Sequence, residues 1–325
     1  MPYKKRAPSI SPDKVKKILI IKLGAFGDMV FSDGVMRQIR AHYEMAEITL
    51  LTEPFYAKLW TNAPYIDATM LDHRPSRLNL MAMHRLKKKL VSGSFDLVID
   101  LQNSSRSRQY RHWLRDSITC GKEDPADFVY QLDKGKPQSL ADILAAQVGL
   151  LGVNLDAGYA PDMRWLGKAA QTSTALTELS NTISEKSILL VPGASARNAD
   201  KRWPHFDGLS ALLKAQGWQC YTAPGPDEIE LCTSLPCPSL MLDGKPLTFA
   251  QLAAISHRFN FVVGNDTGPT HLIAACQLPS LILLGSRGQP DRIRINEMMN
   301  FVETQDLNAL AAQDVFEALM VDLNQ

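Results

Sequence analysis

Short apolar runs alternate with segments of helical spacing along most of this chain. The first run, Ile18 to Ile21, is too short for a helix and rich in β-branched residues, so it predicts a buried strand. Gly24-Ala-Phe-Gly27 then interrupts the pattern, and apolar residues recur at helical spacing from Met29 to Tyr43. Further strands are expected at 48–51 and 95–101, and helices around 85–90 and 139–151. This alternation is typical of βαβ units and a mainly parallel sheet.

The alternation stops and restarts once. Regularity is lost between Asn154 and Ser180, so we expect an N-terminal domain at 1–165 and a C-terminal domain at 166–325. Strands are then predicted at 187–191, 219–222, 261–263 and 280–284, and helices at 206–216, 249–259 and 270–276. The simplest architecture is α/β, with two doubly wound, Rossmann-like domains and a ligand cleft between them. The last helix is expected to pack back on the first domain.

Composition excludes several classes of protein. No apolar run approaches the ~20 residues of a transmembrane helix, no signal peptide is evident, and the five cysteines form neither a C-x-x-C pair nor a dense framework. We therefore expect a cytoplasmic protein. Residues 1–170 carry a net charge of +7, from 25 Lys and Arg against 18 Asp and Glu, whereas residues 171–325 carry −6, from 10 against 16. The basic half indicates either an anionic ligand or surface, or simply a solvated face.

The most specific motif is Gly264-Asn-Asp-Thr-Gly-Pro-Thr-His271, which lies between an apolar strand and an apolar helix. Asp266 or Thr267 suits a helix N-cap, Gly268 lets a ligand approach the backbone, and Pro269 suits the first helical turn. The exposed N–H groups and the helix dipole of such a turn bind anions, pyrophosphate among them. An ordinary capped helix, with His271 as a buried and satisfied side chain, fits the motif equally well.

A second motif is the loop from Pro192 to Pro204, which follows a predicted strand. Its glycine turn brings Lys201 and Arg202 near the same strand ends, where these cations would neutralise phosphates. A solvated basic loop is the alternative interpretation.

The third motif is Lys22-Leu-Gly-Ala-Phe-Gly-Asp28 in the first half. Asp28 would start the following helix, as either a general base or a cap. The spacing is G-x-x-G rather than the G-x-G-x-x-G of dinucleotide-binding folds, although Glu53 lies where a ribose-binding acid would be. A nicotinamide-dependent oxidoreductase therefore stays open as an alternative, as does an inactive two-lobed nucleotide-binding protein.

The remaining candidates are weaker. Arg106 begins a basic stretch that would either grip an anionic acceptor or face solvent. Asp227 and Glu228 would either contact a ribose or serve as turn and cap residues. No Asp-x-Asp occurs, so a carboxylate pair that clamps a metal diphosphate is not indicated, and no metal ligands are predicted.

Taken together, these segments resemble glycosyltransferase family 9, the bacterial lipopolysaccharide heptosyltransferase family. The matching pieces are Lys22 to Val30, Phe95 to Arg106, Pro192 to Pro204 with its Asp-Lys-Arg-Trp-Pro core, and Asn265 to Ala275. The resemblance implies a GT-B fold and an inverting, metal-independent transfer, commonly of heptose from ADP-heptose to the lipopolysaccharide core. It leaves the acceptor open, since the segment around 71–83 matches nothing in the family pattern.

The resemblance also implies roles for individual residues. Asp28 matches the general base and Lys201 the cation on the donor phosphates, while Asp266, Thr267, Gly268 and His271 match the donor-binding turn. Ser195 and Asp227 are further donor-binding candidates, and Arg106 and Gly27 are acceptor-binding candidates. The implied partners are a nucleotide-sugar donor and an anionic glycan or glycolipid, with peripheral contact with the inner membrane leaflet. No cofactor and no nucleic acid are expected.

Overall fold

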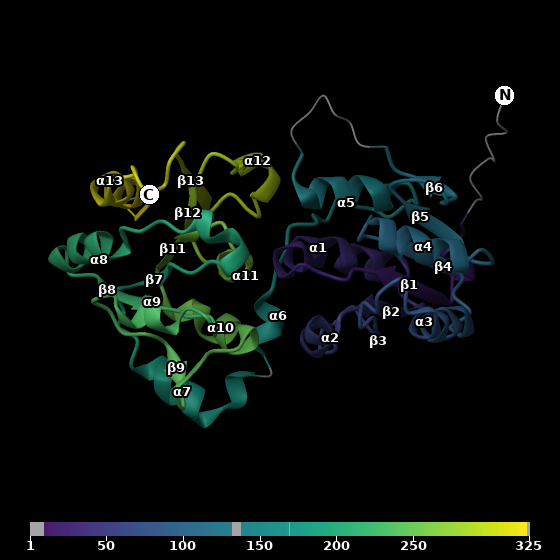
Figure 1. Ribbon diagram of the computed structural model, residues 1–325, viewed down its shortest axis with the longest axis horizontal. Helices are drawn as coiled ribbons and strands as arrows, with labels where there is room; N and C mark the ends of the chain where they lie inside the picture. The colour runs from purple at the N-terminus through teal and green to yellow at the C-terminus, as the bar shows by residue number, and fades with distance from the viewer. Residues whose placement is uncertain (1–9, 132–137, 169, 324–325) are drawn as a thin grey trace. The chain divides into compact units, whose positions relative to one another are not determined.

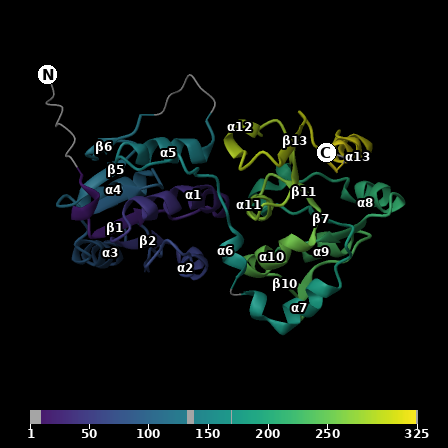
Figure 2. The ribbon, with the colours of Figure 1, turned by 180° about the vertical axis from the view of Figure 1, so that it is seen from behind.

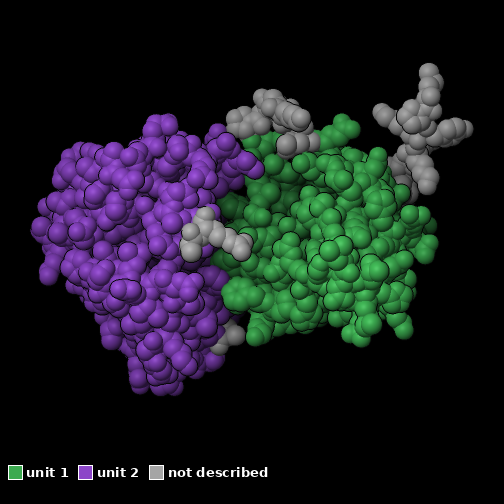
Figure 3. All heavy atoms as spheres, viewed as in Figure 1, with its two compact units in different colours: residues 1–161 green, residues 162–325 purple. Residues whose placement is uncertain are grey.

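The computed structural model describes residues 10–131, 138–168 and 170–323. The chain divides into two compact units, Met1–Pro161 and Asp162–Gln325, which Figure 3 distinguishes by colour. The division falls inside the segment where the sequence loses its regularity, four residues before the expected boundary.

Unit 1 contains a six-stranded parallel sheet in the order β3-β2-β1-β4-β5-β6. This is the order of a dinucleotide-binding fold, which reverses direction between β1 and β4. The strands are β1 (Lys17–Ile21), β2 (Glu47–Thr52), β3 (Ala68–Leu71), β4 (Leu97–Asp100), β5 (Ile118–Gly121) and β6 (Phe128–Val129).

Helices cover both faces of this sheet. They are α1 (Phe26–His42), α2 (Pro54–Trp60), α3 (Leu80–Ser92), α4 (Ser105–Trp113) and α5 (Leu140–Gly149), with a short 3-10 turn at Pro12–Lys14. Helices α1 and α5 pack on each other (Figure 1). The apolar residues of α3 and α4 join a core cluster with alternate residues of β1, among them Leu19 and Ile21. A strand covered on both faces explains why the 18–21 run is continuously apolar.

Unit 2 contains a five-stranded parallel sheet in the order β13-β12-β11-β7-β8. Counted within the unit this is the 2-1-3-4-5 order, which reverses between β7 and β11. The strands are β7 (Ser187–Val191), β8 (Gln219–Thr222), β11 (Phe261–Asn265), β12 (Ser280–Leu284) and β13 (Met299–Glu303), with a separate antiparallel pair β9 (Met241–Leu242) and β10 (Lys245–Pro246).

The second sheet is also covered on both faces. Its helices are α6 (Arg164–Gly167), α7 (Thr174–Asn181), α8 (Phe206–Ala215), α9 (Ile229–Thr233), α10 (Phe249–Ile255), α11 (Gly268–Ala275), α12 (Pro290–Ile293) and α13 (Ala312–Leu323), with 3-10 segments η2 (Ala170–Thr172), η3 (Ala196–Lys201) and η4 (Ser256–Arg258). Along β7, Ile188 and Leu190 face the core under α8 and α13, whereas Leu189 and Val191 face the core under α7 and α10. Figure 2 shows α8 and α10 on opposite sides of the unit.

The last helix, α13, packs on α8 within unit 2. Its buried residues, Val315 and Leu319, belong to the core of that unit. Whether it also packs on the first domain stays a prediction.

Within the described residues, no helix combines the length and apolarity needed to cross a bilayer. The five cysteines carry free thiols.

Candidate functional site

The loops after β7 and β11 carry all of the candidate donor-binding residues of unit 2 except Asp227, Gly268 and His271. They lie where the strand order reverses, the position at which doubly wound sheets bind ligands. Asn265, fully buried at the end of β11, joins the two loops. Its Oδ1 accepts a hydrogen bond from the Trp203 amide at 3.1 Å, and its Nδ2 donates to the Pro192 carbonyl at 2.8 Å. These bonds fix the Pro192–Pro204 loop against the β11 turn.

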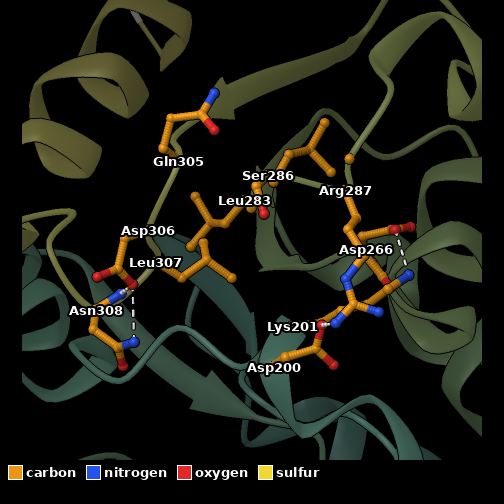
Figure 4. Close-up of a pocket in the computed structure, with 13 residues that line it drawn as sticks. Asp200, Lys201, Asp266, Leu283, Ser286, Arg287, Gln305, Asp306, Leu307 and Asn308 are labelled. Carbon is orange, nitrogen blue, oxygen red and sulfur yellow. Dashed lines mark hydrogen bonds and ion pairs between the residues drawn. The ribbon is translucent and has the colours of Figure 1, made fainter.

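Three of the predicted donor-binding residues meet at this edge. Lys201 Nζ donates to Asp266 Oδ2 at 2.6 Å, and His271 Nε2 lies 2.9 Å from Asp266 Oδ1. Burial alone would raise the pKa of the Asp266 carboxyl, but the bonds and charges of His271 and Lys201 lower this pKa to about 2. Asp266 is therefore ionised at neutral pH and holds the ammonium of Lys201 in place (Figure 4).

Helix α11 begins beside this cluster. Thr267 is its N-cap residue but makes no side-chain cap, and Pro269 in the first turn has no N–H. The amides of the first turn thus lack intrahelical acceptors and lie at the positive end of the helix dipole. Gly264 is needed just before, because a Cβ there would lie 2.7 Å from Thr270 Oγ1. The sequence motif thus places a helix N-terminus beside Lys201 and Asp266, and anion binding by this turn stays a prediction.

A pocket of about 250 Å³ opens next to Lys201 and Asp266. On one side, Arg287 pairs with Asp200 at 2.7 Å, and on the other, Asp306 accepts hydrogen bonds from the Asn308 amide and side chain (Figure 4). The lining residues are Asp200, Lys201, Asp266, Leu283, Leu284, Gly285, Ser286, Arg287, Gly288, Gln305, Asp306, Leu307 and Asn308. The pocket therefore offers both charges and amide groups to a polar ligand.

The other two donor-binding candidates, Ser195 and Asp227, lie on the loops after β7 and β8. Ser195 precedes η3 and its Oγ accepts from Asn198 Nδ2 at 3.1 Å. Asp227 is exposed on the loop after β8. The neighbouring Glu228, which the sequence offered beside Asp227 as a ribose contact, packs so close to the β7 loop that a Cβ on Gly193 would lie 2.0 Å from Glu228 Oε2. Its carboxylate also accepts from the Gly225 amide at 2.9 Å, so the β8 loop turns Glu228 toward the glycine loop.

In unit 1, the turn after β1 lies where the strand order reverses, between β1 and β4. Gln102, on the loop after β4, accepts hydrogen bonds from the amides of Leu23 and Gly24 at 2.7 and 3.3 Å. Gly24 has a φ of +143°, and a Cβ there would lie 2.6 Å from the Tyr56 ring. The turn therefore needs glycine at position 24, and it leads directly into α1, whose first turn contains Asp28.

Asp28 is half exposed and lies beside a buried cation. The Lys22 ammonium is 3.8 Å from Asp28 Oδ2 and donates to the Leu101 carbonyl at 3.4 Å. Burial lowers the pKa of Lys22, while the charges of Asp28 and Asp100 oppose that shift. The Asp28 carboxylate therefore lies within ion-pair distance of Lys22, in the first turn of α1.

The acceptor-binding candidates occupy two places in unit 1. Gly27 lies in the first turn of α1, next to Asp28. Arg106 is part-buried on α4, where its guanidinium donates to Tyr110 Oη at 2.9 Å and to the Pro75 carbonyl at 2.5 Å. Arg106 thereby anchors the loop after β3.

Two observations concern alternative ligands, a ribose bound by unit 1 and a metal ion. Glu53, the acid that a bound ribose would need in unit 1, is paired with Arg74 at 2.7 Å. Within the described residues, no three His, Cys, Asp or Glu side chains are grouped so that they could hold a metal ion.

Comparison with known proteins gives one family. The family model described as "Glycosyltransferase family 9 (heptosyltransferase)" matches residues 83–300. No curated protein matches the sequence.

Several solved structures are similar over nearly the whole chain. A glycosyl transferase family 9 protein from Veillonella parvula has a TM-score of 0.78 at 18% identity, with 95% of this chain and 97% of that chain covered. The ADP-heptose lps heptosyltransferase II of E. coli has a TM-score of 0.73 at 21% identity, covering 95% and 99%. The E. coli heptosyltransferase WaaC, solved with ADP-2-deoxy-2-fluoro heptose, has a TM-score of 0.71 at 16% identity, covering 94% and 99%.

Likeness at these identities shows the fold. A UDP-GlcNAc 2-epimerase from Methanocaldococcus jannaschii also matches, with a TM-score of 0.57 and 13% identity over 95% of this chain and 93% of that chain. Because transferases and epimerases share the arrangement of two Rossmann-like domains, the fold alone does not separate the two activities.

Proposed function

Because this chain belongs to glycosyltransferase family 9, the heptosyltransferase family, we propose that it transfers heptose from ADP-heptose to a lipopolysaccharide core or a related glycan. The chain has a GT-B fold and is a glycosyltransferase. We propose four things in particular: the donor, the acceptor, an inverting transfer and the absence of a cofactor.

The observation that carries the proposal is the Lys201–Asp266–His271 cluster at the start of α11. A donor diphosphate would accept hydrogen bonds from the first-turn amides and from Lys201, which neutralise the charge that develops as the diphosphate departs. Asp266 is the group that keeps Lys201 at this edge. Its carboxylate would also accept hydrogen bonds from the hydroxyls of the donor sugar.

A ribose would lie on the β8 side of the same edge. In doubly wound folds an acid after the second strand accepts from ribose hydroxyls. Glu228 follows β8, the second strand of unit 2, and contacts the glycine loop. We assign the ribose contact to Glu228 rather than to Asp227.

Asp28 is the proposed base of an inverting displacement. The acceptor oxygen attacks the anomeric carbon, the bond from that carbon to the phosphate oxygen breaks, and the acceptor proton passes to the Asp28 carboxylate. The half-exposed position of Asp28 in the first turn of α1 supports this role. Unit 1 thus supplies the base and unit 2 binds the donor.

The acceptor is proposed to be an anionic glycan or glycolipid at the inner membrane leaflet, with the enzyme in the cytoplasm. The net charge of +7 over residues 1–170 supports this choice. Gly27 would allow the acceptor to approach Asp28, and Arg106 would act by holding the loop after β3.

No metal or organic cofactor is included in the proposal, because Lys201 and the helix N-terminus supply the positive charge that a metal would give. Activity is expected to survive EDTA. A panel with NAD(H) and NADP(H) tests the oxidoreductase alternative, which the family assignment disfavours.

The experiment that tests the proposal is calorimetric titration with ADP. Lys201→Ala is expected to weaken binding by about 1–3 kcal/mol, the value of a charged hydrogen bond. Lys214→Ala, which removes an exposed lysine from α8, is the matched control and should bind ADP like the wild type. Equal affinities for the wild type and Lys201→Ala would contradict the donor site.

A further inference from the structure

A positively charged side chain, Lys22, is buried at the end of strand β1. It directly follows the apolar residues of the strand, and its side chain is only 3% exposed. An ammonium group that leaves water loses several kcal/mol of hydration, which only nearby charges and hydrogen bonds can offset. An apolar side chain at this position would avoid that cost. The reason for a lysine here is therefore to be found in the groups that its ammonium contacts.

The ammonium of Lys22 contacts the loop after β4 and the first turn of α1. Nζ donates to the Leu101 carbonyl at 3.4 Å and lies 3.8 Å from Asp28 Oδ2. A further carboxylate of this region, Asp100, is fully buried, but its Oδ2 faces the Arg111 guanidinium at 3.4 Å. Asp28 is thus the carboxylate that lies within ion-pair distance of Lys22.

The backbone holds Lys22 in a fixed position. Its amide donates to the Leu51 carbonyl at 3.1 Å, which continues the pairing of β1 with β2. The next two amides, those of Leu23 and Gly24, donate to the Gln102 side chain at 2.7 and 3.3 Å. A side chain that is enclosed by protein and attached to an anchored backbone has few rotamers available. The ammonium is therefore a fixed charge at the edge of the sheet.

Asp28, in contrast, has solvent on one side. Its side chain is 49% exposed, and an exposed side chain exchanges rotamers rapidly. A general base must lie within about 2.6–3.2 Å of the hydroxyl whose proton it takes, and an error of about 1 Å in such a position can lower a rate about 10²-fold. The Lys22 contact selects the rotamers in which Oδ2 faces the ammonium. The other oxygen, Oδ1, can then accept the proton.

We propose that Lys22 is a positioning residue for Asp28: its buried ammonium holds Oδ2 and thereby directs Oδ1 toward the acceptor hydroxyl. This inference rests on the proposed function, in which Asp28 is the base. Lys22 exchanges no proton itself, because the proton passes from the acceptor oxygen to Asp28 as that oxygen bonds to the anomeric carbon. The alternative is a structural role, in which Lys22 only fastens the loop after β4 through the Leu101 carbonyl.

Two variants separate the two contacts of Lys22. Lys22→Met removes both contacts at a similar side-chain volume, whereas Lys22→Gln keeps an N–H group for the Leu101 carbonyl but has no charge for Asp28. Both should lower kcat about tenfold or more for transfer from ADP-heptose to a lipopolysaccharide core oligosaccharide. ADP affinity and acceptor KM should stay within about twofold of the wild type, since neither ligand loses a contact. The melting temperature of Lys22→Met should not fall, because the variant removes a buried charge. Lys17→Met, at the exposed start of the same strand, is the matched control and should keep the wild-type kcat.

A double-mutant cycle with Asp28→Asn completes the test. Once the carboxylate is gone, Lys22→Met should lower kcat by no more than about a further twofold, because Lys22 acts through that group. Three results would overturn the positioning role: wild-type kcat in Lys22→Met, recovery of kcat by Lys22→Gln, or the full additional loss in the Asp28→Asn background. Each of them leaves Asp28 as the base. Near-wild-type turnover by Asp28→Asn would contradict the proposed function itself, so the two failures are distinguishable.

Discussion

Asp266 offers the sharpest test of the electrostatics in unit 2. The structure lowers its pKa from 3.8 to about 2, and its side chain is only 16% exposed, so solvent screens the interaction weakly. Since one pKa unit corresponds to about 1.4 kcal/mol, the ionised carboxylate contributes about 2 kcal/mol to folding at neutral pH. Asp266→Asn removes this contribution and leaves Lys201 without its anionic partner.

The sign of the pH dependence follows from the direction of the shift. A carboxyl whose pKa is lower in the folded state stabilises the protein above its unfolded pKa, near 4, and loses this effect as the pH falls toward 2. Urea unfolding at pH 7 should therefore show Asp266→Asn to be less stable than the wild type by about 2 kcal/mol. The difference should shrink between pH 4 and pH 2, where the wild-type carboxyl takes up a proton.

Asp200→Asn is the matched control, because Asp200 pairs with Arg287 in the same region but both side chains are substantially exposed. An exposed pair contributes only about 0–1 kcal/mol. The reasoning is refuted if Asp266→Asn costs no more than Asp200→Asn at pH 7, or if its cost is the same at pH 2 as at pH 7.

Three further outcomes are expected. Glu228→Gln should weaken ADP binding in calorimetry through a lost ribose contact, whereas Asp227→Asn should not; equal affinities would remove the ribose role. Gly24→Ala should lower the free energy of unfolding by more than about 1 kcal/mol, because position 24 has a positive φ and abuts Tyr56; unchanged urea unfolding would contradict this. Raised ionic strength should increase the acceptor KM more than the donor KM; a salt-independent acceptor KM would indicate that the basic half is merely solvated.

The central strands were predictable because both of their faces are covered. β1, β7 and β11 each contain an unbroken run of buried apolar residues, and each lies inside its sheet. The strands missed by sequence analysis are short or lie nearer the edges. β13 includes Asn300 and Glu303, and β5 has only four residues, Ile-Thr-Cys-Gly. Such sequences carry too little periodic signal to separate a strand from a loop.

The site was predictable only as separate pieces. The Gly264–His271 motif and the Lys201 loop each predicted an anion site, but their ion pair depends on Asn265, whose buried side chain joins the two loops. The choice between Asp227 and Glu228 depends on one backbone bond, from the Gly225 amide to Glu228. The 71–83 segment gave no prediction, because its exposed leucines, Leu78 and Leu80, are not part of a hydrophobic core.

The role of Asp28 is the central claim about mechanism. Asp28→Asn keeps the shape of the side chain and its place in the first turn of α1, but it cannot accept the acceptor proton. A general base contributes about 10²–10⁴-fold to a rate, whereas a helix-terminal contact contributes only stability. Asp116→Asn, a change at an exposed carboxylate of the same unit, is the control.

The decisive measurement is the rate of sugar transfer from ADP-heptose by Asp28→Asn, with ADP affinity and melting temperature measured in the same preparation. The account predicts that kcat falls by about 10²-fold or more while ADP affinity and melting temperature stay at the wild-type values. Turnover within a few-fold of the wild type, or a loss of activity that only follows the loss of folded protein, would show that Asp28 is structural and contradict the account.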